Sequence, residues 1–203
     1  MNKSIETMMS EHRLIEQVLG ALGTFTEALK DNPSLPRAEV AKFGRFFQRF
    51  ADKCHHGKEE DRLFVKMSEC GFPTEYGPIG VMLAEHGEGR NHVRALADIG
   101  AGSGLLTAQE VERVIEHAEA FIPLLLGHIQ KEDNVLYPMA QQAIPPTEFA
   151  KLDAACEAFD REVMGADEVG SLKALARELT ATYPPCQERL AAAAACGGCG
   201  GHR

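Results

Sequence analysis

The sequence lacks any long run of apolar residues near its start. The first 30 of its 203 residues carry charges throughout. A membrane-spanning helix needs about 20 predominantly apolar residues, and a secretory signal also needs an apolar segment. The sequence therefore predicts a cytoplasmic protein with neither a signal peptide nor a membrane partner.

Positive charge is scarce as well. Lysine and arginine number 21 against 30 aspartates and glutamates, which gives a formal net charge of -9. Nucleic-acid backbones and anionic membranes both favour a basic protein surface. Neither is expected as the main partner, and most of the acidic residues are expected to lie on a solvated surface.

Six cysteines without an export signal indicate reduced thiols and not a disulfide framework. Four are scattered and are interpreted as small apolar filler or partly exposed thiols: Cys54, Cys70, Cys156 and Cys186. Cys196 and Cys199 lie in a glycine-rich tail, residues 196–203, which is expected to be mobile. We interpret this tail as inert or accessory, in preference to a redox-active dithiol or a weak metal site that includes His202.

Strand-like alternation is almost absent, and helical periodicity dominates the segment 1–143. The pattern predicts an all-α fold, an up-down-up-down four-helix bundle. Segments rich in proline or glycine separate the four expected helices, which span about 4–30, 37–69, 79–99 and 107–143.

Thr107, with Glu110 three residues later, is expected to cap the fourth helix. Pro123 removes one backbone hydrogen bond and predicts a bend just before His128, not a break. Beyond the bundle, 1–143, short helices at 147–163 and 171–181 predict a helical extension over 144–195.

One motif occurs twice along the chain, as His55-x-x-Lys58-Glu59-Glu60 and as His128-x-x-Lys131-Glu132-Asp133. Residues four apart in an α-helix project from the same face, so each copy directs an imidazole and a carboxylate to one point. The dipeptide Glu-His also occurs twice, as Glu11-His12 and Glu85-His86, and its two copies are almost as far apart in the sequence as the two copies of the motif. A histidine-bearing helix followed by a His-x-x-x-Glu helix therefore occurs twice.

Two helical hairpins of this kind bring four histidines and two glutamates into the middle of a bundle, where metal sites are built from inward-facing side chains. Buried carboxylates are costly unless they are compensated, and metal coordination is a common compensation. The predicted ligands are His12, His55, Glu59, His86, His128 and Glu132. Imidazole and carboxylate donors exclude calcium and leave iron, manganese or zinc. Six ligands suit two carboxylate-bridged ions, and two irons fit best.

The order His12, His55-x-x-x-Glu59, His86, His128-x-x-x-Glu132 resembles the hemerythrin-like superfamily of HHE cation-binding domains, and most closely the repair-of-iron-centres type. Residues 54–61 and 77–86 are also similar to bacterial single-domain members, and the resemblance covers residues 1 to about 143. It implies that His12 and His55 bind one iron, that His86 and His128 bind the other, and that Glu59 and Glu132 bridge them.

The sequence departs from oxygen-carrying hemerythrins at Arg90, which stands where their third helix has a second histidine. This departure argues against simple oxygen carriage and favours reaction with oxygen, peroxide or nitric oxide at a more open iron. The short cysteine-bearing amino-terminal domain often present in repair-of-iron-centres proteins is also missing, which weakens a direct transfer of that role.

Other polar residues have two interpretations. His56 is either a partly exposed helix residue or, as in some relatives that include the iron-sensing F-box protein, a further ligand of the second iron. Tyr137 either fills the core, which is preferred, or forms a hydrogen bond toward the centre. His92 is interpreted as a surface residue or as one that surrounds the metal ligands without binding metal. His117 is interpreted as a buried, hydrogen-bonded residue about 16 Å from His128 along the helix axis.

A ligating imidazole needs an acceptor at its other ring nitrogen. Candidates for this role are Glu60, Asp61, Glu85, Glu88 and Asp133.

These features predict a non-haem di-iron protein that binds or reacts with a small oxidant or gas. The alternatives are a sensor that signals through its carboxy-terminal segment and an iron donor for iron–sulfur cluster repair. Whether the protein is an enzyme is left open, and a protein partner or a homo-oligomer is an alternative assembly.

Overall fold

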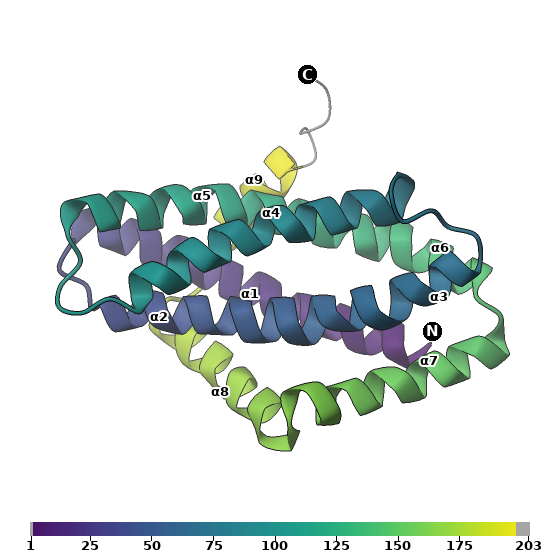
Figure 1. Cartoon of the computed structure of the whole chain (residues 1–203). Coiled ribbons are helices and arrows are strands. Elements are labelled where there is room, and N and C mark those ends of the chain that lie inside the picture. The colour runs from purple at the N-terminus through teal and green to yellow at the C-terminus, as the bar shows by residue number, and fades with distance from the viewer. Residues whose placement is uncertain (1, 198–203) are drawn as a thin grey trace.

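The computed structural model describes residues 2–197, and almost all of them are helical (Figure 1). The bundle consists of α1 (Lys3–Asp31), α2 (Arg37–Phe46), η1 (Phe47–His56), η2 (Glu59–Leu63), α3 (Phe64–Glu69), α4 (Gly77–Gly100), α5 (Ala108–Lys131), η3 (Glu132–Leu136) and α6 (Tyr137–Ala143). The extension consists of α7 (Pro146–Phe159), η4 (Asp160–Met164), α8 (Ala166–Thr182) and α9 (Gln187–Gly197). The predicted all-α bundle is confirmed.

The labels η mark π-helical segments. Segments η1, η2 and η3 lie within two of the four long helices, which stay continuous through them, and η4 follows α7 in the extension. The second long helix runs continuously from α2 to α3, and the fourth runs from α5 through Pro123 to α6. The segments η2 and η3 occupy equivalent places in the repeat, since each begins at the glutamate of its His-x-x-x-Glu motif. π-Helical turns are rare and occur frequently at functional sites. The sequence pattern did not predict them.

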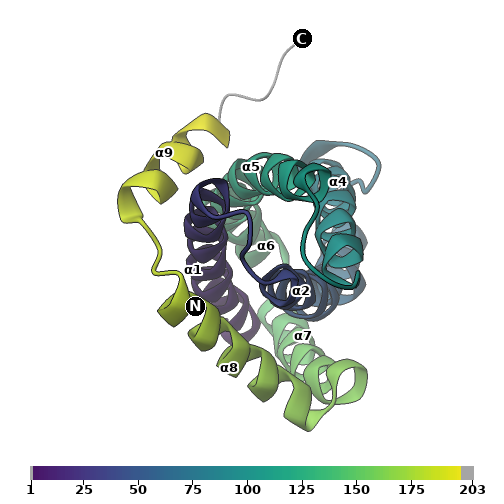
Figure 2. The ribbon, with the colours of Figure 1, turned by 90° about the vertical axis from the view of Figure 1, so that its left-hand side faces the viewer.

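The four long helices form a closed ring in which α1 packs on α5, α5 on α4, α4 on α2, and η1 on α1 (Figure 2). The extension covers one side of this ring. Helices α7 and α8 lie against α1 and the second long helix, whereas α9 lies against α1 and α5. The alanine-rich segment after Pro185 was not predicted to be helical, but it forms α9. Residues 198–203, most of the predicted tail, lie outside the described residues.

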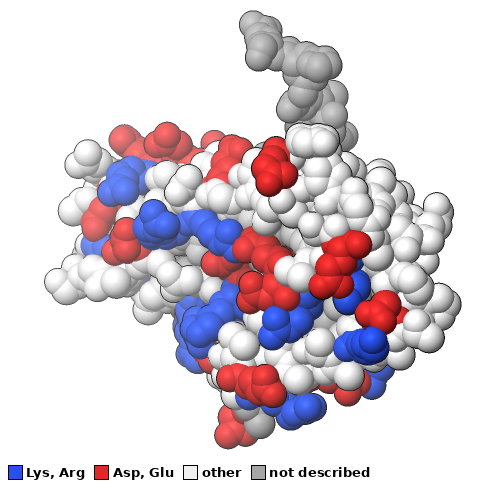
Figure 3. Space-filling model, turned by 45° about the vertical axis from the view of Figure 1, so that its right-hand side comes forward, with Lys and Arg blue, Asp and Glu red and all other residues white. Residues whose placement is uncertain are grey.

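Ion pairs attach the extension to the bundle, and basic and acidic side chains lie side by side on the face drawn in Figure 3. Pairs near the surface that link the two parts include Lys3–Glu157, Lys42–Glu178, Arg49–Glu168 and Lys66–Glu148. Exposed pairs contribute little stability, about 0–1 kcal/mol each. The buried apolar residues of α7 and α8, among them Phe159 and Leu172, must therefore supply most of the attachment.

The core consists of two apolar clusters with a polar layer between them. One cluster includes Ile5 and Met8 of α1, and the other begins at Ile15, farther along the same helix. His12 lies between them and is fully buried. The predicted ligand positions therefore lie inside the bundle, where water is largely excluded.

Arg37 fixes the turn between α4 and α5. Its guanidinium donates hydrogen bonds to the carbonyls of Ile99, Gly104 and Leu105, and forms a bidentate pair with Glu110 at 2.7 and 2.8 Å. Glu110 also completes the predicted capping box with Thr107. These hydrogen bonds to Glu110, from Arg37 first and Thr107 second, lower its pKa to about 2.

The pH dependence of unfolding, compared between the wild type and the Glu110→Gln variant, tests the contribution of the Arg37–Glu110 pair. Because the folded-state pKa of Glu110 is depressed, its contribution to stability is present above about pH 4.5 and is lost as the pH falls toward 2. We expect the wild type to be more stable than the variant at pH 7, with the difference disappearing by about pH 2. Urea unfolding followed by circular dichroism at several pH values measures the free energy of unfolding of both proteins. A difference between them that stays constant across the pH range would contradict the expectation.

None of the helices within residues 2–197 is both long and apolar enough to cross a lipid bilayer.

Candidate metal centre

The side chains of the predicted ligands meet in two groups that share one glutamate. The first group contains His12, His55, Glu59 and Glu132, and the second contains His56, Glu59, His86 and His128. Within each group the donor atoms lie within 4.8 Å of one another, and all seven residues are buried. The division of the four predicted histidines is the one that the family resemblance implies. That these residues bind metal stays a prediction.

The two glutamates lie between the groups. Glu132 places Oε2 at 3.2 Å from His12 Nε2 and Oε1 at 3.2 Å from His128 Nε2. Glu59 places Oε2 at 3.6 Å from His55 Nε2 and 3.5 Å from His86 Nε2. Each carboxylate therefore faces a histidine of both groups, which is the arrangement that a bridging ligand requires.

Several buried polar atoms of the centre have no hydrogen-bond partner. These atoms are His55 Nε2, His56 Nδ1, Glu59 Oε2 and both carboxylate oxygens of Glu132. Leaving a buried polar group without a partner costs about 1–3 kcal/mol, and more for a charged group. Cations would satisfy these atoms, which come from both groups, so the donor set fits a metal pair.

His56 joins the second group, as one of its two interpretations predicted. Its side chain is buried and its ring stacks on that of His86, with centroids 3.8 Å apart. The equivalent position in the second copy of the motif is Ile129, so the two groups are chemically unequal. The second group has three imidazoles, whereas the first has two.

Each of the four predicted histidines uses Nδ1 to contact a carboxylate on another helix. The pairs are His12 with Asp133 (2.7 Å), His55 with Glu11 (2.9 Å), His86 with Glu60 (2.6 Å) and His128 with Glu85 (2.9 Å). A proton on Nδ1 leaves Nε2 as the free donor atom, and the carboxylate fixes the orientation of the ring. Glu60, Glu85 and Asp133 were among the predicted candidates, but Glu11 was not.

The repeat accounts for the choice of these carboxylates. Glu11 and Glu85 precede the histidines of the Glu-His dipeptides and bind the histidine of the other helix in the same hairpin. Glu60 and Asp133 follow Glu59 and Glu132 in the sequence, and each contacts a histidine of the opposite hairpin. Glu11 could have been found from the sequence, because it matches Glu85 in the repeat.

Each of the four carboxylates that contact a histidine Nδ1 atom also forms an ion pair with a lysine or an arginine. Lys58 pairs with Glu11 and Lys131 with Glu85, which explains the lysine in each copy of the motif. The remaining pairs are Arg13 with Asp133 and Arg90 with Glu60. Arg90 is thus the residue that orients Glu60, and it stands in place of the histidine of oxygen-carrying hemerythrins.

Burial and neighbouring charges set the protonation of the centre. Burial, followed by the positive charge of nearby imidazoles, holds the pKa values of His55 and His86 well below the usual range. Burial and the adjacent Glu132 raise the pKa of Glu59 well above its usual range. Burial would lower the pKa of His128, but Glu132 and Glu85 outweigh it and raise this pKa to about 9. Protons therefore compensate the carboxylates in the metal-free centre, and cation binding must displace them.

Tyr137 contributes a hydroxyl to the first group and is fully buried. It donates a hydrogen bond of 2.6 Å to Glu59 Oε1, and its oxygen lies 3.3 Å from His12 Nε2. The preferred prediction, that Tyr137 simply fills the core, was incomplete. Its repeat counterpart Phe64 has no hydroxyl, and this adds a second asymmetry between the two groups.

The Tyr137→Phe variant makes this position match the other half of the repeat. We expect it to fold with full metal content, because no predicted ligand is lost, but with about 1–2 kcal/mol less stability, because Glu59 Oε1 loses its donor. Thermal unfolding and metal analysis measure both quantities. Tyr137→Phe keeps the aromatic ring and removes only the hydroxyl, whereas Phe64→Leu removes a ring at the equivalent position and shows the separate cost of lost packing. A Tyr137→Phe protein without metal would instead make the hydroxyl a ligand.

The remaining candidates lie outside the centre. His92 and His117 contact each other through their Nδ1 atoms at 3.1 Å, and both are only half-buried. The prediction that His117 is buried was therefore wrong, because its partner lies at the edge between α4 and α5. Within residues 2–197, Asp61 and Glu88, two predicted acceptors, form no hydrogen bond with any of the histidines predicted to bind metal. Cys54, Cys70, Cys156 and Cys186 are free thiols, and Cys199 and His202 lie outside the described residues.

Comparison with known proteins agrees with this centre. A family model described as the hemerythrin HHE cation binding domain matches residues 3–140. Uncharacterized proteins of Mycobacterium bovis and of two strains of Mycobacterium tuberculosis are 20% identical to the chain over 157 residues. The match covers 77% of this chain but only 60% of theirs. No solved structure matched the chain. Because the family model covers well over half of its residues, the chain belongs to the hemerythrin HHE cation-binding domain family.

Proposed function

We propose that this metal-binding protein holds two non-haem iron ions and reacts with a small oxidant or gas, namely oxygen, peroxide or nitric oxide. The observation that carries the proposal is the set of buried, unpartnered donor atoms on His55, Glu59 and Glu132. They lie between histidines whose Nε2 atoms face inward, so two cations bridged by carboxylates satisfy all of them together.

In this proposal His12 and His55 hold the first iron, and His86, His128 and His56 hold the second, while Glu59 and Glu132 bridge them. Bound iron supplies redox chemistry and an electrophilic centre for a small ligand. The carboxylates at the Nδ1 atoms keep the imidazoles oriented, and the two apolar clusters exclude bulk water. Tyr137 holds a proton at hydrogen-bond distance from Glu59 Oε1.

Iron is preferred to zinc or manganese because of the donor set. Five imidazoles and two carboxylates exceed the four ligands that a structural zinc ion normally takes. Imidazoles are also softer donors than the oxygen ligands that manganese prefers. The first group has fewer nitrogen donors, and we expect the small ligand to bind there.

Metal analysis combined with an absorption spectrum tests the proposal. We expect two irons per chain and a visible spectrum that appears when the ferrous protein is exposed to air or peroxide. Repeated consumption of peroxide or nitric oxide by one centre would indicate catalysis. A colourless protein that contains only zinc, or ferrous iron inert toward all three reagents, would overturn the proposal.

A second candidate function is a sensor that signals through the extension. It is favoured by Lys58, which contacts Asp160 of η4 at 2.9 Å and also pairs with Glu11, the partner of His55. A change at the centre therefore has a direct route to residues 144–195. A sensor should react about once per centre, and the rate of protease cleavage within residues 144–195 should change. A catalyst should instead consume many molecules of peroxide or nitric oxide per centre, with the rate of cleavage unchanged. Iron donation to damaged iron–sulfur clusters instead requires rapid loss of iron to an apo-cluster acceptor.

A further inference from the structure

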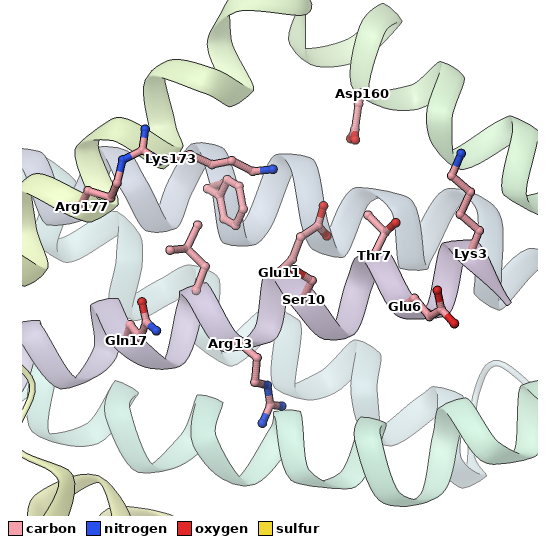
Figure 4. A pocket seen from close by; sticks show the side chains of 12 residues that line it. Lys3, Glu6, Thr7, Ser10, Glu11, Arg13, Gln17, Asp160, Lys173 and Arg177 are labelled. Carbon is pink, nitrogen blue, oxygen red and sulfur yellow. The ribbon is translucent and has the colours of Figure 1, made fainter. Parts of the chain in front are cut away.

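A second site candidate lies between α1 and the extension, outside the metal centre. The cavity has a volume of about 620 Å³ and is bounded by α1, by Phe50 of η1, by Asp160 of η4 and by α8 (Figure 4). Small-molecule sites typically occupy about 300–1,000 Å³. The cavity is thus large enough for an organic molecule, whereas the ligands proposed for the metal centre contain only a few atoms.

The charges that line this cavity leave positive charge without a partner. Lys173 and Arg177 lie one turn apart on α8, and neither forms an ion pair or hydrogen bond with another described residue. Glu11 and Asp160, which also line the cavity, both pair with Lys58. In a chain with a net charge of -9, two adjacent cations without a partner beside a cavity favour an anionic ligand.

The wall also offers apolar and hydrogen-bonding surface. Phe50 and Leu14 contribute apolar atoms, while Ser10 and Gln17 contribute polar groups. In Figure 4 the side chain of Lys173 extends from α8 along the cavity in the direction of Glu11. A ligand held by Lys173 would therefore lie inside this cavity, whose wall includes Phe50 and Glu11.

We propose that this cavity binds a small organic anion, whose carboxylate, phosphate or sulfonate group is held by Lys173 and Arg177 and whose apolar body lies against Phe50 and Leu14. Glu11 forms part of the wall and also contacts His55 Nδ1 at 2.9 Å. The bound anion is therefore separated from the metal centre by a single side chain.

A pair of fluorescent probes tests the proposal on the full chain, with or without metal. The anionic probe is 8-anilinonaphthalene-1-sulfonate, and N-phenyl-1-naphthylamine has the same aromatic frame without the sulfonate. The chain contains no tryptophan, so background emission is low. We expect one anionic probe per chain, bound at least about fivefold more tightly than the neutral probe at low salt, with a smaller ratio at high salt.

The variant that tests the site is Lys173→Ala/Arg177→Ala. It should reduce the affinity for the anionic probe about fivefold to tenfold and leave the neutral probe unaffected, because only the charged contacts are lost. Arg45→Ala/Arg113→Ala removes the same charge from exposed positions elsewhere and should change neither affinity. All four residues are exposed, so both variants should fold.

A second, largely apolar cavity of about 350 Å³ lies between α1, α5 and α9 and is a competing site for aromatic probes. Binding there would be similar for the two probes and insensitive to substitution on α8. Equal affinities of the two probes, or an anionic affinity that the Lys173→Ala/Arg177→Ala variant leaves unchanged, would overturn the proposal. Because metal-free protein serves as well as loaded protein, this result does not depend on the proposed function.

Discussion

Glutamine in place of Glu59 should reduce the bound metal from two ions to at most one per chain while leaving the fold intact. The substitution keeps the shape of the side chain and the oxygen that accepts the hydrogen bond of Tyr137. It removes the negative charge that faces both His55 and His86. Burial and the adjacent Glu132 raise the pKa of Glu59 well above its usual range, which favours its neutral form without metal, and glutamine resembles that form. The metal-free forms should therefore melt at similar temperatures.

The neighbouring Glu60→Gln variant is the matched control. Glu60 contacts Nδ1 of His86 and the guanidinium of Arg90, but it is not a member of either donor group. We expect it to retain two metals with an affinity about 10–100-fold lower, as is typical when a partner of a ligating histidine is lost. If Glu59→Gln retained two metals and Glu60→Gln lost one, the bridge would be wrongly assigned and Glu60 with His56 would be the ligand pair.

Replacing Lys58 with methionine should lower the free energy of unfolding by about 2–4 kcal/mol. The lysine is almost fully buried, and its ammonium contacts Glu11, Asp160 and the thiol of Cys54. Methionine fills a similar volume but leaves the carboxylates of Glu11 and Asp160 without this cation. The Glu11 carboxylate is buried, so water cannot replace the lost contact. Urea unfolding of the metal-free protein measures the loss. Cleavage by trypsin within 144–195 should also become faster, because Asp160 no longer anchors η4.

The repeat again supplies the control, Lys131→Met. Lys131 holds the equivalent position and pairs with Glu85, but its side chain is 42% exposed. Water can solvate Glu85 when the lysine is lost, so the expected change is below about 1 kcal/mol. Equal effects of the two substitutions would show that Lys58 forms an ordinary surface pair and would remove the support for signalling through η4.

Much of the fold could be predicted from the sequence because its helices are long and amphipathic. Apolar residues such as Ile15, Leu19 and Leu22 recur at helical spacing, and proline-rich turns separate the segments, so the four helices and their order follow locally. The capping box at Thr107 was predictable for the same reason. Helix α9 was missed because its alanine run has little apolar contrast, and packing on α1 and α5 decides its conformation.

The candidate centre could be predicted because a duplicated motif identifies it twice. His55 with Glu59 and His128 with Glu132 share a helix face in each copy, and such spacing is read directly from the chain. The role of His56 could not be decided in this way. It depends on the π-helical turns around it and on the ring of His86, which belongs to a different helix, α4.

The sequence by itself determined the helices, the repeat and the identity of the candidate metal ligands, because these depend on the local period of an α-helix and on the chemistry of each side chain. Only the tertiary structure decided which carboxylate orients which histidine, why Lys58 is buried while Lys131 is exposed, and where the cavity beside α8 lies. Those features depend on contacts between residues distant in sequence, such as Lys58 with Asp160, and on an extension that covers only one side of a nearly symmetric bundle.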